Sequence, residues 1–186
     1  MKIVETPIRD LYILEPKVFG DHRGYFYESY NKDVLEKYNL KYDFVQDNQA
    51  YSGFGVVRGL HYQHPPYAQA KLLRVVEGEI IDIAVDLRKG SPTFGRWYGV
   101  KLSGENHKQF LVPKGFAHGY SVLSERCIVQ YKCDEFYHPE EEGGIYPFDA
   151  ELDIDWGINF GNAKLSDKDK VLPSFRECVN KFEFNG

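Results

Sequence analysis

The stretch VVRGLHYQHPPYAQAKLLRVVEGEIIDIAVDLRKGSPTFGRW, residues 56–97, decides the fold. It contains short runs rich in Val, Ile and Leu, and turns that contain Gly78 and Gly90 divide these runs. β-branched residues favour pleated strands, and glycine supports the backbone of tight turns. We therefore expect strands over residues 70–76 and 79–87.

Runs of the same kind continue beyond this stretch, and Gly or Pro again separates them. Strands spaced in this way indicate an antiparallel sandwich or barrel. Helices are scarce in the pattern: Asn31 can cap a short helix over residues 32–38, and a second short turn can begin at Ser166. We expect an all-β fold, whose further strands are residues 95–102, 107–112, 117–123 and 126–136.

Side-chain alternation leaves two interpretations of the strand at residues 79–87. Ile81 and Ile83 lie on one face, and Asp82 and Asp86 lie on the other. The default for an antiparallel sheet places the polar face in solvent. In a closed barrel, the polar face can instead line a ligand cavity.

Composition excludes several classes of protein. The 186 residues carry 23 Lys and Arg against 28 Asp and Glu, a formal charge of −5, so a nucleic-acid polymer is not the expected partner. No apolar run is long enough to span a membrane, and the N-terminus lacks the apolar core of a signal peptide. Three cysteines without a CxxC pair favour reduced thiols. We expect a single cytoplasmic domain over residues 1–186, and the 16% aromatic content fits β-structure.

Histidines at the ends of the expected strands suggest either metal binding or acid–base chemistry. His61 and His118 could begin a metal site, but Gln63, on the strand face of His61, is a poor ligand for zinc or iron. Alternatively, a histidine acts as a base, which needs an orienting carboxylate and an opposing acid. The candidates for these two roles are Tyr131, Asp82, Asp86 and Asp169. The residues alone do not decide which of them faces His61.

Three cations stand in sequence contexts that allow a binding role. Lys71 alternates with apolar residues, so it is either an edge residue or a buried cation with a task. Arg23 and Arg58 each lie next to a glycine, where a guanidinium can reach phosphate oxygens or can simply be exposed in a turn. No phosphate-binding glycine loop and no serine hydrolase motif accompany them.

Several strings together resemble one family over nearly the whole chain, the dTDP-4-dehydrorhamnose 3,5-epimerases of the cupin superfamily. Beside the stretch already quoted, the strings are GDHRGYFYE, VPKGFAHGYSVLS, YKCDEFYHPEEEGGI and LSDKDK. The resemblance implies a double-stranded β-helix, or cupin jelly roll, with a few short helices at its periphery and C-terminus. It further implies a homodimer and a cavity that works without metal or cofactor. The implied substrate is a nucleotide-diphospho-4-keto-6-deoxyhexose that is inverted at C3 and C5.

The same resemblance implies roles for individual residues. His61 matches the general base, Asp169 the carboxylate that orients it, and Tyr131 the general acid. Lys71 matches the cation beside the enolate oxygen, and Tyr137 matches the aromatic residue that stacks on the nucleotide base. The remaining positions that match ligand contacts are Arg23, Glu28, Gln46, Asn48, Arg58, His118, Glu142 and Lys168.

Three alternatives to the double epimerase stay open at this point. A single-site epimerase of a related deoxysugar pathway would use a very similar site. A metal-dependent cupin oxygenase or isomerase is suggested by His61 and His118, and a non-catalytic sugar-binding jelly roll is suggested by the aromatic content.

Overall fold

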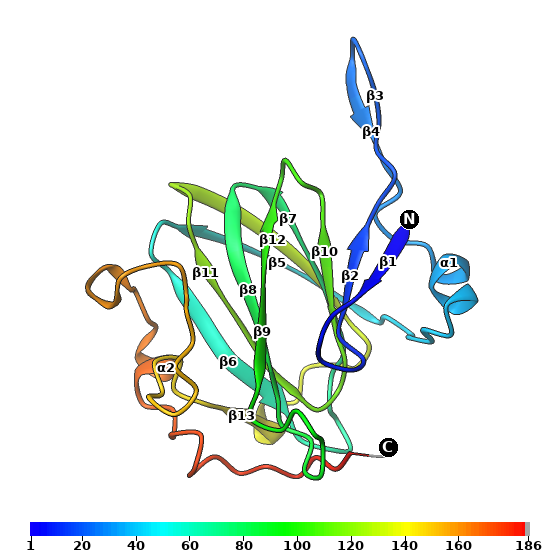
Figure 1. Ribbon diagram of the computed structural model, residues 1–186. Helices are drawn as coiled ribbons and strands as arrows, with labels where there is room; N and C mark the ends of the chain where they lie inside the picture. The colour runs from blue at the N-terminus through cyan, green and yellow to red at the C-terminus, as the bar shows by residue number, and fades with distance from the viewer. Residues whose placement is uncertain (185–186) are drawn as a thin grey trace.

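The computed structural model describes residues 1–184, and most of the regular structure in them is β-strand (Figure 1). The strands are β1 Lys2–Glu5, β2 Tyr12–Glu15, β3 Phe19–Asp21, β4 Gly24–Phe26, β5 Gln46–Gly53, β6 Val57–Gln63, β7 Lys71–Glu77, β8 Glu79–Asp86, β9 Trp97–Ser103, β10 Gln109–Val112, β11 Phe116–Val122, β12 Arg126–Cys133 and β13 Glu142–Gly144. The helices are α1 Lys32–Lys37 and α2 Asp167–Lys170, with 3₁₀ turns at Pro139–Glu141 and Phe160–Asn162. The all-β prediction is confirmed.

Two antiparallel sheets face each other across the centre of the molecule. The larger has the strand order β1-β2-β10-β7-β12-β5, and the smaller has the order β13-β6-β11-β8-β9. Inward-pointing apolar side chains of both sheets, such as Leu73, Ile80, Phe110 and Val129, form the core between them. This core joins the two sheets into one sandwich.

The smaller sheet is buried on both faces, which corrects the default interpretation of residues 79–87. Asp82 and Asp86 are both fully buried, so the polar face does not meet solvent. Ile83 and Val85 point the other way and pack beneath a C-terminal segment that includes Trp156. This segment lies over the outer face of the sheet, and α2 belongs to it (Figure 1).

The strands expected between residues 70 and 136 are confirmed, with ends that differ by up to three residues. The helix after Asn31 is also confirmed, since the Asn31 side chain accepts a hydrogen bond from Val34 N. The five strands before residue 55 were not predicted. β5 explains why, because its sequence QDNQAYSG has neither an apolar run nor a clear alternation.

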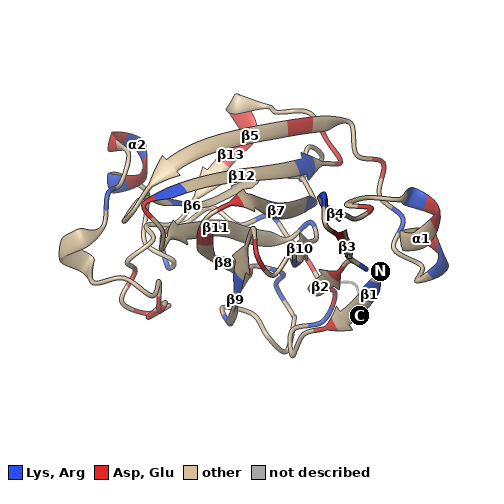
Figure 2. Cartoon of the chain, turned by 90° about the horizontal axis from the view of Figure 1, so that it is seen from above, with Lys and Arg blue, Asp and Glu red and all other residues tan. Residues whose placement is uncertain are grey.

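β3 and β4 form a separate hairpin that we call the arm, residues 19–26. The two strands pair only with each other and project from the body beside β2, whereas α2 lies on the opposite side of the barrel (Figures 1 and 2). Every residue of both strands is exposed, including Phe19, Tyr25 and Phe26. Because an isolated two-stranded hairpin is marginally stable in water, the arm needs a further contact surface.

Gly59 provides a test of how closely β6 packs on β11. Its φ is +120°, and a Cβ there would lie 2.6 Å from Gly119 Cα and 2.7 Å from the His118 carbonyl oxygen. Gly59→Ala therefore combines backbone strain with overpacking. Gly90 is the matched control, because its φ is +84° and a Cβ there would meet no atom within 4 Å. In urea unfolding we expect Gly90→Ala to lose about 1–2 kcal/mol and Gly59→Ala to lose about 1–3 kcal/mol more. Equal losses would contradict the close packing.

Candidate functional site

A cavity of about 420 Å³ opens between the two sheets. β6 and β11 supply one wall, β7 and β12 supply the facing wall, and residues of α2 close one side. Its polar lining residues are Arg58, His61, Lys71, His118, Tyr120, Tyr131, Lys164, Ser166, Lys168 and Asp169. Seven positions singled out in the sequence therefore meet in one cavity.

His61 and Asp169 form a hydrogen-bonded pair across 108 residues of chain. The distance from His61 Nε2 to Asp169 Oδ1 is 2.7 Å. Ser166, the N-cap of α2, accepts a hydrogen bond from Asp169 N at 3.1 Å and so holds the carboxylate in place. Burial alone would raise the pKa of Asp169, but hydrogen bonds from His61, Ser166 and the Gly59 backbone outweigh it and lower that pKa. The carboxylate therefore stays ionised and engages Nε2, which leaves Nδ1 as the nitrogen available to a ligand.

Lys71 brings an ammonium group into the cavity without an ion-pair partner. Among residues 1–184, no carboxylate oxygen lies within 4.0 Å of its Nζ. Burial lowers the pKa of Lys71, while the nearby Cys133, Glu142 and Asp82 act to raise it. Such a cation destabilises the empty protein and is compensated when an anionic ligand atom binds beside it.

Tyr131 enters the cavity from the sheet that faces His61. It lies on β12, whereas His61 lies on β6 of the smaller sheet. Burial raises the pKa of Tyr131, followed by the effect of Cys133, so the phenol keeps its proton at neutral pH. The site thus offers an imidazole on one wall and a proton-bearing phenol on the other.

His118 and Asp82 form a second hydrogen-bonded pair. His118 Nε2 lies 2.6 Å from Asp82 Oδ1, and Asp82 is fully buried. His118 is also the cross-strand partner of His61 in the pairing of β11 with β6. Asp82 was one of the carboxylates considered as the partner of His61, but it bonds to His118 instead.

Glu142, Tyr137 and Lys168 make a polar cluster at the rim of the cavity. Glu142 Oε2 accepts hydrogen bonds from Tyr137 Oη at 2.6 Å and from Lys168 Nζ at 2.5 Å. Glu142 Oε1 lies 3.8 Å from His61 Nδ1, so the cluster adjoins the imidazole. Tyr137 is half exposed, which leaves one face of its ring open to a planar ligand.

Gln46 and Asn48 join this rim from β5. Gln46 Oε1 accepts a hydrogen bond from Tyr137 N at 3.1 Å, and Gln46 Nε2 donates to Asn48 Oδ1 at 3.1 Å. Arg58 donates to Ser52 Oγ from Nε at 3.2 Å and from Nη2 at 3.1 Å. These contacts place amide and guanidinium groups around the mouth, where a polar ligand would extend.

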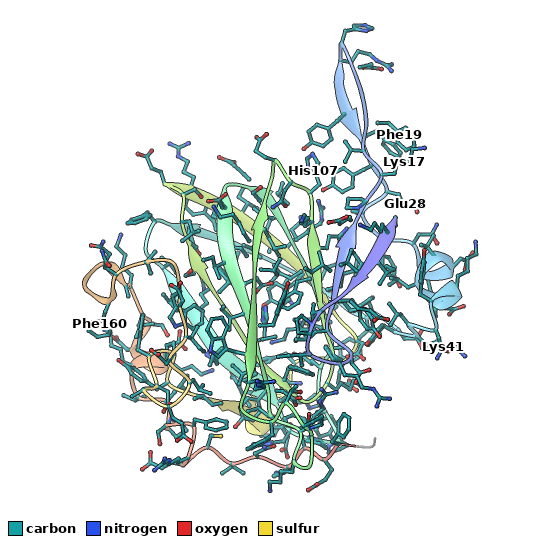
Figure 3. The ribbon with its side chains drawn as sticks, viewed as in Figure 1. Lys17, Phe19, Glu28, Lys41, His107 and Phe160 are labelled. Carbon is teal, nitrogen blue, oxygen red and sulfur yellow. The ribbon has the colours of Figure 1, made fainter. Side chains whose placement is uncertain are left out.

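Arg23 and Glu28 are the predicted residues that this chain does not bring to its own cavity. Arg23 lies in the arm and pairs with Asp21 at 2.5 Å. Glu28 follows the arm and accepts a hydrogen bond from Asn31 at 3.1 Å. Figure 3 shows Phe19 on this projecting segment and Glu28 at its base, and neither Arg23 nor Glu28 lines the cavity.

Tyr120 is a lining residue that the sequence reasoning missed. It is directly paired with Asp82 across β11 and β8, and its hydroxyl is buried without a hydrogen-bond partner among the described residues. Alternation gives the signal that could have found it, because Tyr120 shares a strand face with His118. Lys164 and Ser166 were also not expected to line the cavity.

Other classes of site find no support in the described part of the chain. Within residues 1–184, no three His, Cys, Asp or Glu side chains are grouped so that they could hold a metal ion. The helices in this range are also too short and too polar to cross a bilayer. Basic and acidic residues are intermixed along the chain rather than gathered on one basic face (Figure 2).

Comparisons with known proteins agree on one family. The sequence model of the dTDP-4-dehydrorhamnose 3,5-epimerases matches residues 5–177. A relative from Shigella flexneri, named dTDP-4-dehydrorhamnose 3,5-epimerase, is 52% identical over 170 residues, which cover 91% of this chain and 93% of the relative.

Solved structures show the same similarity in three dimensions. The crystal structure of dTDP-4-dehydrorhamnose 3,5-epimerase from Elizabethkingia anophelis matches with a TM-score of 0.91 and 52% identity, covering 95% of this chain and 97% of that chain. The epimerase from Legionella pneumophila, solved in complex with dTDP-4-keto-L-rhamnose, matches with a TM-score of 0.91 and 48% identity, covering 95% and 93%. The cupin-like jelly roll that the resemblance implied is thereby confirmed.

Lys71→Met tests whether the cavity ammonium lacks a partner in the empty protein. A lowered folded-state pKa means that the charged form destabilises the fold at pH values below that pKa, so removing the charge should raise stability at pH 7 by about 1 kcal/mol. Arg88 is the matched control, since it is also enclosed but pairs with Asp86 at 2.9 Å and Asp10 at 2.6 Å. Arg88→Met should lose about 3–5 kcal/mol, because it leaves Asp86 buried and unpaired. A loss of stability in Lys71→Met, measured by thermal unfolding, would contradict this interpretation.

Proposed function

The chain belongs to the dTDP-4-dehydrorhamnose 3,5-epimerase family, and from this premise we propose how its cavity inverts C3 and C5 of a nucleotide-diphospho-4-keto-6-deoxyhexose. The activity is that of an isomerase acting on a carbohydrate. The single observation that carries the mechanism is the placement of an oriented imidazole, an unpaired ammonium and a phenol in one cavity.

His61 is the base that removes the proton next to the ketone. Asp169 engages Nε2 at 2.7 Å, so the lone pair on Nδ1 is directed at the substrate. When Nδ1 takes the proton, the C–H electron pair moves into the ring and onto the C4 oxygen, which becomes an enolate. The ionised Asp169 stabilises the imidazolium that forms, as an orienting carboxylate does in other His–Asp pairs.

Lys71 receives the negative charge that develops on the C4 oxygen. A fixed ammonium in an enclosed site needs no reorganisation at the moment of reaction, and such stabilisation is worth about 3–4 kcal/mol. Since C3 and C5 both flank C4, one cation serves the enolates that form toward either carbon. His118, whose free ring nitrogen is Nδ1, lines the same part of the cavity.

Tyr131 returns a proton to the opposite face of the ring. It stands on the sheet that faces His61, so a sugar held between the sheets has the base on one side and the phenol on the other. When the phenol protonates carbon, the enolate electrons form the new C–H bond and the configuration is inverted. The imidazolium and the phenolate then recover their starting states by proton exchange with solvent.

The rim residues fit the nucleotide diphosphate. Arg58 and Lys168 are cations beside the mouth, and guanidinium and ammonium groups both bind phosphate oxygens. Tyr137 offers an open ring face for the base, while Gln46 and Asn48 offer amide groups. Glu142 holds Tyr137 and Lys168 together before the substrate binds. A local cluster of cations therefore suffices in a chain of net charge −5.

A homodimer accounts for the arm. Its exposed aromatic residues need a surface to cover them, and neither Arg23 nor Glu28 lines the cavity of its own chain. We assign that surface to the second copy, so that Arg23 of each arm and the adjoining Glu28 enter the partner's site. The described cysteines are all free thiols, which fits a reducing compartment, and we place the reaction in the cytoplasm.

Turnover of dTDP-4-keto-6-deoxyglucose in D₂O tests the proposed function. Each inversion replaces a carbon-bound hydrogen with one from solvent, so NMR of the product should show deuterium at both C3 and C5. Incorporation at one carbon alone would indicate a single-site epimerase. Absence of incorporation at either carbon would overturn the proposal.

Two variants separate the base from the acid in the same experiment. His61→Asn should reduce exchange and product formation together by about 10²–10⁴-fold. Tyr131→Phe should reduce inverted product to a similar extent while exchange in recovered substrate continues, because His61 still removes and returns the proton on its own side. Equal loss of exchange in both variants would contradict the division of roles.

Complementation between inactive variants tests the arm. We expect Arg23→Ala and His61→Asn each to be inactive as homodimers, whereas a mixture that is unfolded and refolded together should recover activity. In a mixed dimer, one site combines an intact His61 with an intact arm from the partner, so random pairing restores about one quarter of wild-type activity. Recovery near zero would show that the arm serves its own chain. The two variants refolded separately and then mixed provide the control.

A further inference from the structure

The Asp82–His118 pair is not needed to orient the proposed base, which raises the question of what it does. Asp82 is fully buried on β8 and bonds His118 Nε2 at 2.6 Å. Placing a carboxylate there is unfavourable, because burial raises the pKa of Asp82, and only part of that cost is recovered from His118 and Lys71. A buried acid that bonds a cavity-lining histidine from behind is therefore expected to serve the ligand-bound state.

Two polar atoms beside this pair lack partners. Among residues 1–184, Asp82 Oδ2 and Tyr120 Oη are buried and make no hydrogen bond. Asp82 and Tyr120 are directly opposite each other in the pairing of β8 with β11. The carboxylate thus keeps one oxygen uncommitted on the side of the strand that faces into the barrel.

The charge of Asp82 also affects Lys71, although the two side chains form no ion pair. Burial lowers the pKa of Lys71 and the charge of Asp82 opposes that shift, yet no ion pair within 4.0 Å forms between them. A direct salt bridge would turn the ammonium away from the substrate. At a longer distance, the carboxylate favours the charged form of Lys71 and leaves its N–H donors free.

We propose that Asp82 is a positioning residue of the epimerase site. Its Oδ1 fixes the His118 ring with Nδ1 toward the cavity, and its negative charge attracts the Lys71 ammonium that faces the enolate oxygen. This inference rests on the role proposed above for Lys71. It gives the Asp82–His118 pair the task of stabilising negative charge on the C4 oxygen, whereas the His61–Asp169 pair removes protons from carbon.

Other charged or titratable groups also face this part of the site. They come from β6, β11, β12 and β13 and are Arg58, His61, His118, Tyr120, Tyr131, Cys133 and Glu142. Burial raises the pKa of Tyr131 and also that of Cys133, whereas it lowers that of Lys71. The pKa of Lys71 is thus the one of these three that burial shifts downward.

Asp82→Asn tests the inference because it removes the charge and keeps the shape. We assign the alkaline limb of kcat/KM against pH to the loss of the Lys71 proton in the free enzyme. Without the Asp82 charge, the folded protein holds that proton less tightly, so the limb should move to lower pH by about one unit. kcat should fall about 10–100-fold at pH 8, while the Kd for dTDP stays within about twofold, since the nucleotide binds at the rim.

Asp86→Asn is the matched control. Asp86 lies on the same strand and is also fully buried, but its partners Arg88, Ser91 and Thr93 do not line the cavity, whereas the Asp82 partner His118 does. We expect this control to lower the melting temperature and to leave the alkaline limb in place. An unchanged limb in Asp82→Asn would overturn the inference. A parallel loss of dTDP affinity without a shift of the limb would assign Asp82 a structural role.

A second readout does not depend on turnover. Ring ¹⁵N NMR of the wild-type protein should show neutral His118 protonated at Nε2, and Asp82→Leu should abolish this preference. A wild-type ring protonated at Nδ1 would overturn the positioning role even in an active enzyme. If the wild type instead exchanges no deuterium, the proposed function fails, and the NMR result still decides whether Asp82 orients His118.

Discussion

A lysine ammonium enclosed between two β-sheets, with no carboxylate within ion-pair distance in the described part of the chain, is the constraint around which the cavity is organised. An apolar residue at position 71 would continue the core that Leu73 and Val75 begin on the same strand. The cation keeps the two sheets from closing over apolar side chains at this end. Burial disfavours its charge, and acidic groups on three other strands oppose that effect only in part.

The route of the C-terminal segment follows from a second constraint, the apolar outer face of the smaller sheet. Ile83 and Val85 would be exposed there if the chain ended after β13, so residues with large apolar side chains, such as Trp156, pack over them. The same segment then carries Ser166 and Asp169 to the edge of the cavity, where Asp169 meets His61. One stretch of chain thus covers the sheet and orients the proposed base. A change in the packing of this segment would therefore alter the orientation of the His61 imidazole.

Residues 70–136 could be predicted as strands because glycine and proline mark their ends, whereas β5 could not, since its edge position requires no apolar pattern. Periodicity placed Asp82 and Asp86 on one face but could not show that this face is buried, which depends on closure by the other sheet. No local pattern links His61 to Asp169, because the pair joins segments 108 residues apart. The resemblance of several strings to one family supplied that link. For Arg23 and Glu28, even the folded single chain shows no cavity contact.

Inversion of a carbon centre requires a proton acceptor on one face of a flat enolate and a proton donor on the other. A sandwich of two sheets provides a wall on each side of the bound ring, and each wall can carry one of these groups. His61 and Tyr131 each stand on a strand whose neighbours on both sides are hydrogen-bonded, so neither group depends on a flexible loop for its position. A site built on one sheet could remove a proton and return it, but only from the same side. A site enclosed between two sheets also limits the access of water, which would otherwise reprotonate the enolate without regard to face. Stereochemical control in this enzyme is therefore a property of the barrel, and the individual catalytic groups supply only the proton transfers.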